Sequence, residues 1–245
     1  MIFPKINLHI HSYYSDGKNT IEQIIKKAQK LNYDFIAITD HFSDSWKSNI
    51  IKTLDSQEKI QDYLDEIHFY NNYLKKSGSK LRALKGIEID LGSSFNIVRR
   101  LVNPQEFNLI LFEYLETYES IAFIQKIIKE WKNNYQLDDY QLIFGLAHFD
   151  PSNFLYDDFK ILLDFLRKYN IYIEFNSNYP QYYSTKYREI FYDKLIPFRI
   201  PVATSSDSHY LSQLDEIDGP LSIIEYYELN NNYKLLLDKL EKIEW

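Results

Sequence analysis

Histidine and carboxylate side chains recur in this chain at spacings that could bind metal. Residues 7–17, NLHIHSYYSDG, put two histidines two residues apart and an aspartate five residues after the second. Five of the six histidines lie at or just after short apolar runs that predict strands: His9, His11, His41, His148 and His209. Carboxylates fall at the same places: Asp16, Glu88, Glu174 and Asp207. Because the chain has no cysteine, a metal must be bound by nitrogen and oxygen, which suit zinc, manganese or iron.

Each of these residues also has a purely structural explanation. An isolated H-x-H pair is a weak metal motif, and His9 with His11 could cap the edge of a sheet. Asp40 could begin a turn, and Asp207 could cap a helix. However, burying many polar side chains together without a ligand costs free energy, and separate structural roles do not account for their repeated position at strand ends. We therefore favour a metal cluster.

Alternating strands and helices are predicted to position these side chains. Seven short apolar runs have the length and composition of strands: 6–11, 35–39, 83–89, 109–112, 142–149, 171–175 and 201–205. Helical periodicity appears between several of them, at 21–31, 60–74, 121–131 and 159–169. Thr20 and Gln23 have the spacing of a capping box at the start of the first helix. The alternation indicates an α/β fold with a parallel sheet.

A single domain over residues 1–245 is expected, because no linker, charge block or internal repeat interrupts the alternation. The sheet could close into a barrel or stay open and doubly wound. In both folds the C-terminal ends of the strands meet on one face, so polar residues far apart in sequence would share one pocket.

Composition disfavours several classes of protein. The formal net charge of −7 argues against a broad nucleic-acid-binding surface, which needs clustered lysine and arginine. The N-terminal segment has no basic flank before a long apolar run, and no stretch approaches about 18 uninterrupted apolar residues. We therefore expect a cytoplasmic protein without a signal peptide or membrane span. The oligomeric state is not indicated.

Five motifs together resemble those of the polymerase and histidinol phosphatase (PHP) superfamily of metal-dependent phosphoesterases. They occur in the order LHIHSYYSDG, IAITDH, KGIEI, GLAHFDP and SSDSH, and extend from about His9 to His209. The resemblance implies a distorted (β/α)7 TIM-like barrel, in agreement with the seven predicted strands. It also implies two or three bound divalent metal ions, which would be zinc, manganese or iron.

The resemblance also implies a set of metal ligands, made of His9, His11, Asp16, His41, Glu88, His148, Asp207 and His209. Glu88 would bridge two of the ions. The family usually offers a further histidine after the fourth strand, whereas this chain reads NLILFEYLE there. We expect either that Glu113 or Glu116 supplies an oxygen ligand in its place, or that the second ion binds more weakly or is absent.

The expected reaction is hydrolysis of a phosphate ester, by in-line attack of a hydroxide held between two metals. Coordination makes this nucleophile available near neutral pH, since it lowers the pKa of water to about 7 in the best-studied zinc enzyme. Asp207 or His209 would assist proton transfer or bind metal. Four cations in predicted loops are candidates for binding the substrate phosphate: Arg99, Arg100, Lys186 and Arg188.

The expected substrate is a small phosphomonoester such as histidinol phosphate, because a chain of this length without an accessory domain resembles the stand-alone phosphatases of the family. Two alternatives stay open. The same chemistry permits a phosphodiesterase or exonuclease that acts on nucleotides or nucleic-acid ends, although the net acidity argues against it. A PHP module that binds metal without turnover is the other alternative.

Overall fold

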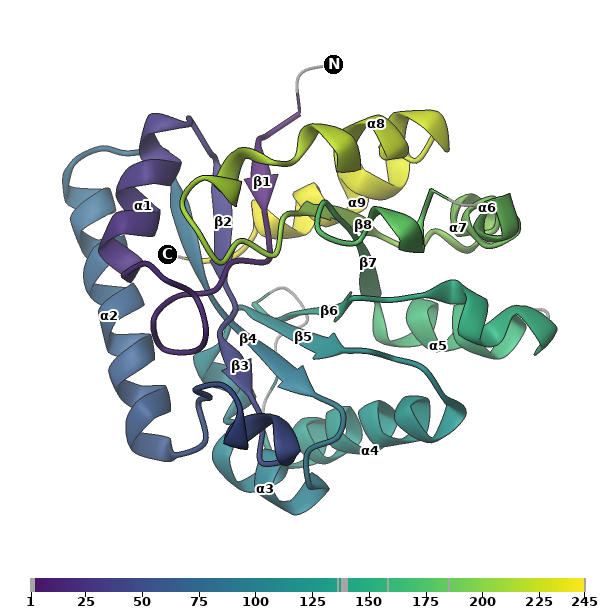
Figure 1. The fold of residues 1–245 in the computed structure, drawn as a ribbon, viewed down its shortest axis with the longest axis horizontal. Coiled ribbons are helices and arrows are strands. Elements are labelled where there is room, and N and C mark those ends of the chain that lie inside the picture. Colours follow the sequence, from purple (N-terminus) through teal and green to yellow (C-terminus); the bar gives the residue numbers. More distant parts are fainter. Residues whose placement is uncertain (1–2, 136, 138–140, 158, 185, 245) are drawn as a thin grey trace.

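Parallel strands form the centre of the structure (Figure 1). The computed structural model describes residues 3–135, 137, 141–157, 159–184 and 186–244. Its strands are β1 (Ile6–Asn7), β2 (Phe35–Ile38), β3 (His41–Phe42), β4 (Arg82–Asp90), β5 (Leu109–Glu113), β6 (Ile143–Ala147), β7 (Ile171–Asn176) and β8 (Val202–Ser205). They follow the order β1–β2–β4–β5–β6–β7–β8. Because β3 pairs with β4 beyond the end of β2, β2 and β3 share one of seven strand positions.

The sheet closes between its first and last strands. Ile10 and Ser208 form a parallel bridge, and the backbone N–H of His11 donates to the carbonyl of Ser208 at 2.9 Å. Closer to the start of the strands, Thr204 Oγ1 donates to the carbonyl of Ile6 at 3.0 Å. These contacts are sparser than the ladders between the other strands, so the barrel is distorted. Closure confirms the predicted (β/α)7 barrel and excludes the open, doubly wound alternative.

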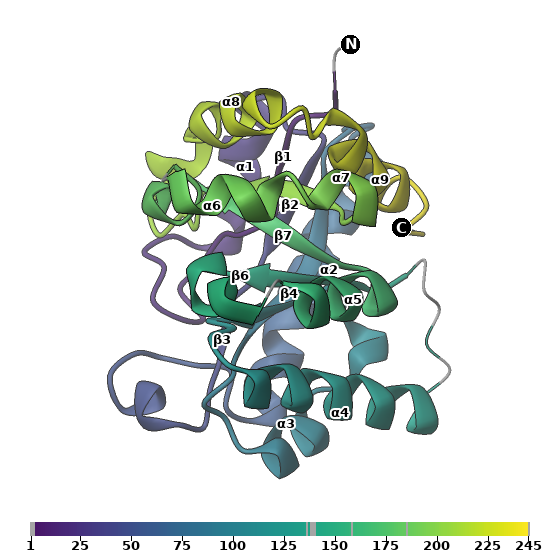
Figure 2. The same cartoon turned by 90° about the vertical axis from the view of Figure 1, so that its right-hand side faces the viewer.

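Helices cover the outside of the barrel (Figures 1 and 2). They are α1 (Ile21–Lys30), α2 (Gln57–Lys76), α3 (Phe95–Leu101), α4 (Tyr118–Asn134), α5 (Lys160–Tyr169), α6 (Lys186–Tyr192), α7 (Leu195–Phe198), α8 (Asp218–Tyr226) and α9 (Asn230–Leu240). In the described ranges, none of these helices combines the length and the apolar character that crossing a membrane requires.

The helices predicted over 21–31, 60–74, 121–131 and 159–169 are confirmed by α1, α2, α4 and α5. Local sequence explains why they form. The capping box of α1 is present: Thr20 accepts from the backbone N–H of Gln23, whose side chain accepts from the backbone N–H of Thr20. The apolar stripe of α4 is buried against the barrel and consists of Ile121, Ile124, Ile127, Ile128 and Trp131. Burial of such side chains typically stabilises a fold by about 1.5–3 kcal/mol each.

The structure differs from the sequence-based expectations in its first strand and in five helices that were not predicted, α3, α6, α7, α8 and α9. The strand expected over 6–11 is regular only at Ile6–Asn7, and the Asn7 side chain contacts backbone groups that follow β8. Its Oδ1 accepts from the backbone N–H of Ser206 at 3.2 Å, and its Nδ2 donates to the carbonyl of Leu214 at 3.1 Å. In addition, α3 and α6 each have only seven residues, too few to show helical periodicity in the sequence.

Candidate metal centre

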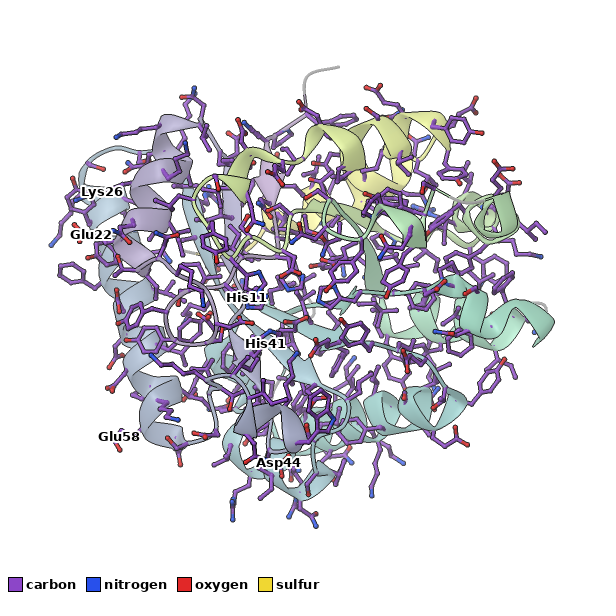
Figure 3. All side chains as sticks on the ribbon, in the orientation of Figure 1. His11, Glu22, Lys26, His41, Asp44 and Glu58 are labelled. Atoms are coloured by element: carbon purple, nitrogen blue, oxygen red, sulfur yellow. The ribbon has the colours of Figure 1, made fainter. Side chains whose placement is uncertain are left out.

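The C-terminal ends of the strands bring the candidate ligands together on one face of the barrel. The contributors are His9, His11 and Asp16 after β1, His41 in β3, Glu88 in β4, Glu113 at the end of β5, His148 after β6, and Asp207 with His209 after β8. Figure 3 labels His11 and His41, whose rings stack near the centre of the molecule with centroids 4.4 Å apart. The structure thus assembles all eight ligands that the sequence predicted, together with Glu113.

Four buried side chains form what we call the inner group: His9, His11, Glu88 and Asp207. His9 Nε2 lies 3.3 Å from Glu88 Oε2, and His11 Nε2 lies 2.9 Å from Asp207 Oδ1. The Nε2 atoms of His9 and His11 lie only 3.0 Å apart. Two imidazole nitrogens and two carboxylates therefore converge on one small volume.

The inner group leaves acceptors available for a cation. Within the described residues, neither oxygen of Glu88 accepts a hydrogen bond of good geometry, and the same is true of Asp207 Oδ1, although all three atoms are buried. Buried carboxylate oxygens without donors are costly unless a cation compensates for them. Nitrogen and oxygen ligands without thiolate suit zinc, manganese or iron. The residues present therefore fit the metal that the sequence implied.

The protonation states of the inner group also suit a metal. Burial opposes ionisation of Glu88, but His9 and His41 outweigh it and hold the pKa of Glu88 well below its ordinary value. Burial and the neighbouring His41 lower the pKa of His11 to about 4, so its imidazole is neutral near pH 7 and has a lone pair to offer. Burial also opposes protonation of His9, yet the surrounding carboxylates raise its pKa, so metal binding would displace a proton from it.

Three further side chains form what we call the outer group: Asp16, His41 and His209. The carboxylate of Asp16 links them, because its Oδ1 lies 3.1 Å from His209 Nε2 and 3.7 Å from His41 Nε2. About a quarter of the side chain of Asp16 and of His209 is exposed. Gly17 allows the tight turn after Asp16, since a Cβ there would lie 2.3 Å from the carbonyl oxygen of His11. A second ion could bind here, closer to solvent.

His148 lies against the inner group on the side of Glu88 Oε1. Its Nε2 lies 3.2 Å from Glu88 Oε1, so the two oxygens of Glu88 face different imidazoles, as expected of a bridging carboxylate. His148 and Asp207 both have left-handed backbone conformations, with φ of 53° and 49°. Residues other than glycine adopt this conformation at a cost, so the surrounding structure must hold these two side chains in place.

Glu174 in β7 contacts two candidate ligands, His9 and His148, and holds them in position. Its Oε2 lies 3.0 Å from His9 Nδ1 and accepts from Ser205 Oγ at 2.6 Å. Its Oε1 accepts from the backbone N–H of His148 at 3.0 Å. The sequence placed Glu174 at the correct level, but only the structure shows that it faces the outer nitrogen of His9. A carboxylate in this position fixes the ring and makes the imidazole a stronger ligand.

Asp40 holds the loop that carries Asp16. It is buried and accepts two hydrogen bonds from Ser12, one from the backbone N–H at 2.8 Å and one from Oγ at 2.5 Å. It also accepts from the backbone N–H of Ser15 at 3.1 Å. Asp40 therefore organises the loop between β1 and α1, a larger role than the turn that the sequence offered as its explanation.

Sequence reasoning missed Lys47, which lies in the short 3-10 helix η1 (Trp46–Asn49). Its Nζ lies 2.6 Å from Glu113 Oε2 and 3.3 Å from His41 Nδ1. Of the two glutamates offered as replacement ligands, Glu113 is the one that reaches the centre, while Glu116 is exposed. No spacing in the sequence marks Lys47, because its position depends on the path of the loop between β3 and α2.

The expectation that the four candidate phosphate-binding cations lie in loops is wrong, because all four lie in short helices. Arg99 and Arg100 lie in α3, and Arg99 Nη1 donates to Glu130 Oε1 of α4 at 3.0 Å. Lys186 and Arg188 lie in α6, and their side chains are outside the described part of the structure. Figure 1 shows α3 and α6 at the periphery. Short helices escaped the sequence pattern, so these segments were expected to be loops.

A cavity of about 230 Å³ opens above the ligands. Members of both groups and Lys47 form its floor, and the rest of its wall is largely apolar, made of Trp46, Ile50, Ile51, Tyr114 and Tyr179. The hydroxyls of Tyr114 and Tyr179 lie 3.4 Å apart. The cavity thus places a charged floor beneath an aromatic and aliphatic rim.

Comparisons with known proteins can now be set beside this geometry. The profile of the PHP domain family matches residues 7–178. The "Probable histidinol-phosphatase" of Thermotoga maritima is 26% identical over 171 residues, which cover 69% of this chain and 64% of that protein. The chain spans less than two thirds of the length of two curated relatives that it matches, 60% of one and 64% of the other.

Two solved structures have a similar fold. Histidinol phosphate phosphatase from Lactococcus lactis, solved with zinc, L-histidinol and phosphate, has a TM-score of 0.60 at 15% identity, covering 91% of this chain and 93% of that one. A structure from the work on YwqE of Bacillus subtilis and CpsB of Streptococcus pneumoniae, described as metal-dependent tyrosine phosphatases, has a TM-score of 0.59 at 16% identity, covering 98% and 95%. At these identities the likeness concerns the fold.

The family assignment rests on the sequence profile, which covers more than half of the chain, and the barrel agrees with it. The buried histidines and carboxylates lie at the strand ends where the motifs predicted them. The chain therefore belongs to the PHP domain family.

Proposed function

We propose that this protein is a metal-dependent phosphatase that hydrolyses a small phosphomonoester. The observation that carries the proposal is the inner group, in which buried oxygens of Glu88 and Asp207 accept no hydrogen bond of good geometry among the described residues and face the imidazole nitrogens of His9 and His11. Such a set of ligands holds divalent cations, and it lies on the floor of a cavity open to solvent.

The inner group would hold one ion, with His148 and the second oxygen of Glu88 extending the site, and the outer group would hold another. Bound divalent ions would supply Lewis acidity, which lowers the pKa of a coordinated water and neutralises charge that develops on the phosphoryl oxygens. Glu174 would keep His9 oriented toward the ion throughout the reaction, because its carboxylate contacts the opposite ring nitrogen.

His209 is the group best placed to exchange a proton with the leaving oxygen of the ester, in which case Asp16 and His41 would hold the outer ion without it. It lines the cavity, its side chain is about one quarter exposed, and its Nδ1 donates to the carbonyl of Asp207 at 2.9 Å. This hydrogen bond leaves Nε2 for Asp16, an ion or the substrate. Asp207, which lies 2.9 Å from His11, is better placed as a ligand than as an acid or base.

The cavity favours a compact substrate with an aromatic or apolar leaving group. Its floor could accept one phosphoryl group, and the rim offers the side chains of Trp46, Tyr114 and Tyr179 to the rest of the molecule. Histidinol phosphate, whose leaving group carries an imidazole ring, fits this description. The likeness to a histidinol phosphate phosphatase fold supports the same class of substrate.

Metal removal and replacement test the proposal directly. Protein treated with a chelator should lose hydrolysis of 4-nitrophenyl phosphate, and adding manganese, zinc or ferrous iron should restore it. Histidinol phosphate should be cleaved more efficiently than a phosphorylated sugar of similar size. Metal-replete protein that cleaves no ester in a broad panel would instead support a PHP module that binds metal without turnover.

The competing phosphodiesterase or exonuclease activity is separated by a matched pair of substrates. We expect higher kcat/KM for 4-nitrophenyl phosphate than for bis(4-nitrophenyl) phosphate, because the floor of the cavity is small and the protein carries a net charge of −7. A preference for the diester, or release of nucleotides from DNA ends, would reverse the assignment.

A further inference from the structure

The proposed function leaves Lys47 and its partner Glu113 without a role. Lys47 Nζ lies among three side chains that could themselves hold a metal: His41, Glu88 and Glu113, whose ligand atoms all lie within 4.8 Å of one another. The ammonium is 2.6 Å from Glu113 Oε2 and 3.3 Å from His41 Nδ1. A protein cation therefore stands where a further divalent ion would bind.

The two glutamates of this cluster, Glu88 and Glu113, differ in how their negative charge is compensated. Within the described residues, both oxygens of Glu88 are buried beside imidazole nitrogens without a hydrogen bond of good geometry, whereas both oxygens of Glu113 contact the ammonium of Lys47. The side chain of Glu113 is 3% exposed and that of Lys47 is 18% exposed. The charge of Glu113 is thus compensated inside the protein, while that of Glu88 remains available for an ion.

His41 is also committed elsewhere. Its Nε2 faces Asp16 of the outer group at 3.7 Å, and its Nδ1 lies 2.8 Å from Glu88 Oε2. A neutral imidazole has one lone pair, so His41 cannot bind one ion through each nitrogen at the same time. If it binds an ion of the outer group through Nε2, its Nδ1 carries a proton, which points toward Glu88.

The loop that carries Lys47 is fixed by hydrogen bonds on both sides of the lysine. Ser43 and Ser45 both donate to Asp90 Oδ2, at 2.7 Å and 2.5 Å. Beyond η1, the backbone N–H of Leu54 donates to the carbonyl of His41 at 2.8 Å. Lys47 is therefore held toward the centre by a built loop, unlike a surface lysine that samples many positions.

We propose that the ammonium of Lys47 takes the place of a metal ion beside Glu113, so that the centre holds two divalent ions and one protein cation on the floor of the cavity. This inference rests on the metal centre of the proposed function and specifies its composition. The ammonium faces the space that a phosphoryl group would enter, where it contributes positive charge that no change in metal supply can remove.

Counting bound ions tests this composition without an activity assay. The full-length protein, stripped of metal, is loaded with excess Mn²⁺, freed of unbound ion by gel filtration and measured by elemental analysis. We expect about two equivalents for the natural sequence. Lys47→Met should bind about three, because Glu113 loses its partner and becomes an oxygen ligand, and the double variant Lys47→Met with Glu113→Gln should return to about two.

The matched control is Lys26→Met. Lys26 pairs with Glu22 at 2.5 Å on the exposed surface of α1, where Figure 3 labels both residues, so its loss should leave the number of ions unchanged. Glu113→Gln provides an independent measurement if Lys47→Met does not fold, and it should keep about two ions. Loss of an ion in Glu113→Gln would overturn the inference, because Glu113 would then be a ligand in the natural protein.

Two other outcomes also overturn the inference and differ in what they say about the proposed function. Three ions in the natural protein, or no gain in a folded Lys47→Met, would leave the metal centre standing but remove the role given to Lys47. No bound ion in any variant would contradict the metal centre itself. The count therefore separates failure of the inference from failure of the proposed function.

Discussion

The inner and outer groups of the centre are built by different means. In the inner group, His9 and Glu88 are fully buried, and the structure behind them is a barrel strand with Glu174 bound to His9. In the outer group, Asp16 and His209 lie on loops and are partly exposed, and the loop of Asp16 depends on the turn that Asp40 organises. The inner site is therefore specified mainly by the packing of strands, and the outer site mainly by hydrogen bonds within loops.

The difference also explains where this chain departs from the expected ligand pattern. Glu113, one of the two glutamates that the resemblance offered in place of a family histidine, pairs with Lys47 on the side of the centre that faces the cavity and the loops. A change of charge there can be compensated by a loop residue. In the inner group the same change would leave a buried charge without a partner, which costs far more.

The largest expected effect comes from removing the inner group. Changing His9 and His11 together to Ala should lower bound metal and reduce phosphatase activity by more than about 100-fold, beyond the ~10–100-fold effect typical of residues that only position ligands. Circular dichroism should show that the barrel is retained. The control is His68→Ala, since His68 on α2 pairs with the exposed Asn72 at 2.9 Å. Unchanged metal content in the double variant would contradict the assignment of these ligands.

A smaller effect is expected when the support of the inner group is changed but its ligands remain. Glu174→Gln keeps the size of the side chain and removes the charge that faces His9 Nδ1. Metal affinity should fall by about 10–100-fold, measured by competition with a chelating dye, while saturating metal restores most of the activity. Glu130→Gln on the surface of α4, which loses only an exposed contact to Arg99, is the control. Equal affinity in both variants would mean that Glu174 does not position His9.

The support of the outer group should respond differently. Asp40→Asn places an amide where Ser12 and Ser15 donate hydrogen bonds, so the free energy of unfolding should fall by about 1–3 kcal/mol. For a chain of this size the Tm should drop by about 2–4 °C per kcal/mol. Metal binding to the outer group should weaken while the inner group keeps its ion. Asp44→Asn is the control, because the side chain of the exposed Asp44, labelled in Figure 3, accepts among the described residues from the backbone N–H of Ser94 alone. Loss of both ions in Asp40→Asn would show that the two groups are not independent.

The sequence predicted which side chains meet at the centre, because their positions follow from strand order. Once the apolar runs predicted parallel strands, residues such as His41 and His148 had to meet at the C-terminal ends, whatever the details of packing. The same reasoning places Glu174 at the right level. It does not say which neighbour Glu174 contacts, since strand alternation fixes the side of the sheet and not the hydrogen-bond partner.

The contacts of loop residues could not be predicted from the sequence, for a physical reason. Lys47 reaches Glu113 only because Ser43 and Ser45 bind Asp90, a contact between residues more than forty positions apart. No local pattern encodes such a contact. The same limit explains Arg99, which was expected near the substrate but pairs with Glu130 on a helix at the periphery.

The smallest expected effect concerns the rim of the cavity. Trp46 is 71% exposed although it lines the cavity, so a substrate ring could pack against it. An aromatic contact of this kind is worth about 0.5–1.5 kcal/mol, so Trp46→Ala should lower kcat/KM for benzyl phosphate by about 2–10-fold. Ethyl phosphate has a leaving group of similar basicity and no ring, so its kcat/KM should stay unchanged, as should the metal content. An equal loss for both esters would mean that Trp46 supports the loop of Lys47, whereas a loss for benzyl phosphate alone assigns it to recognition of the leaving group.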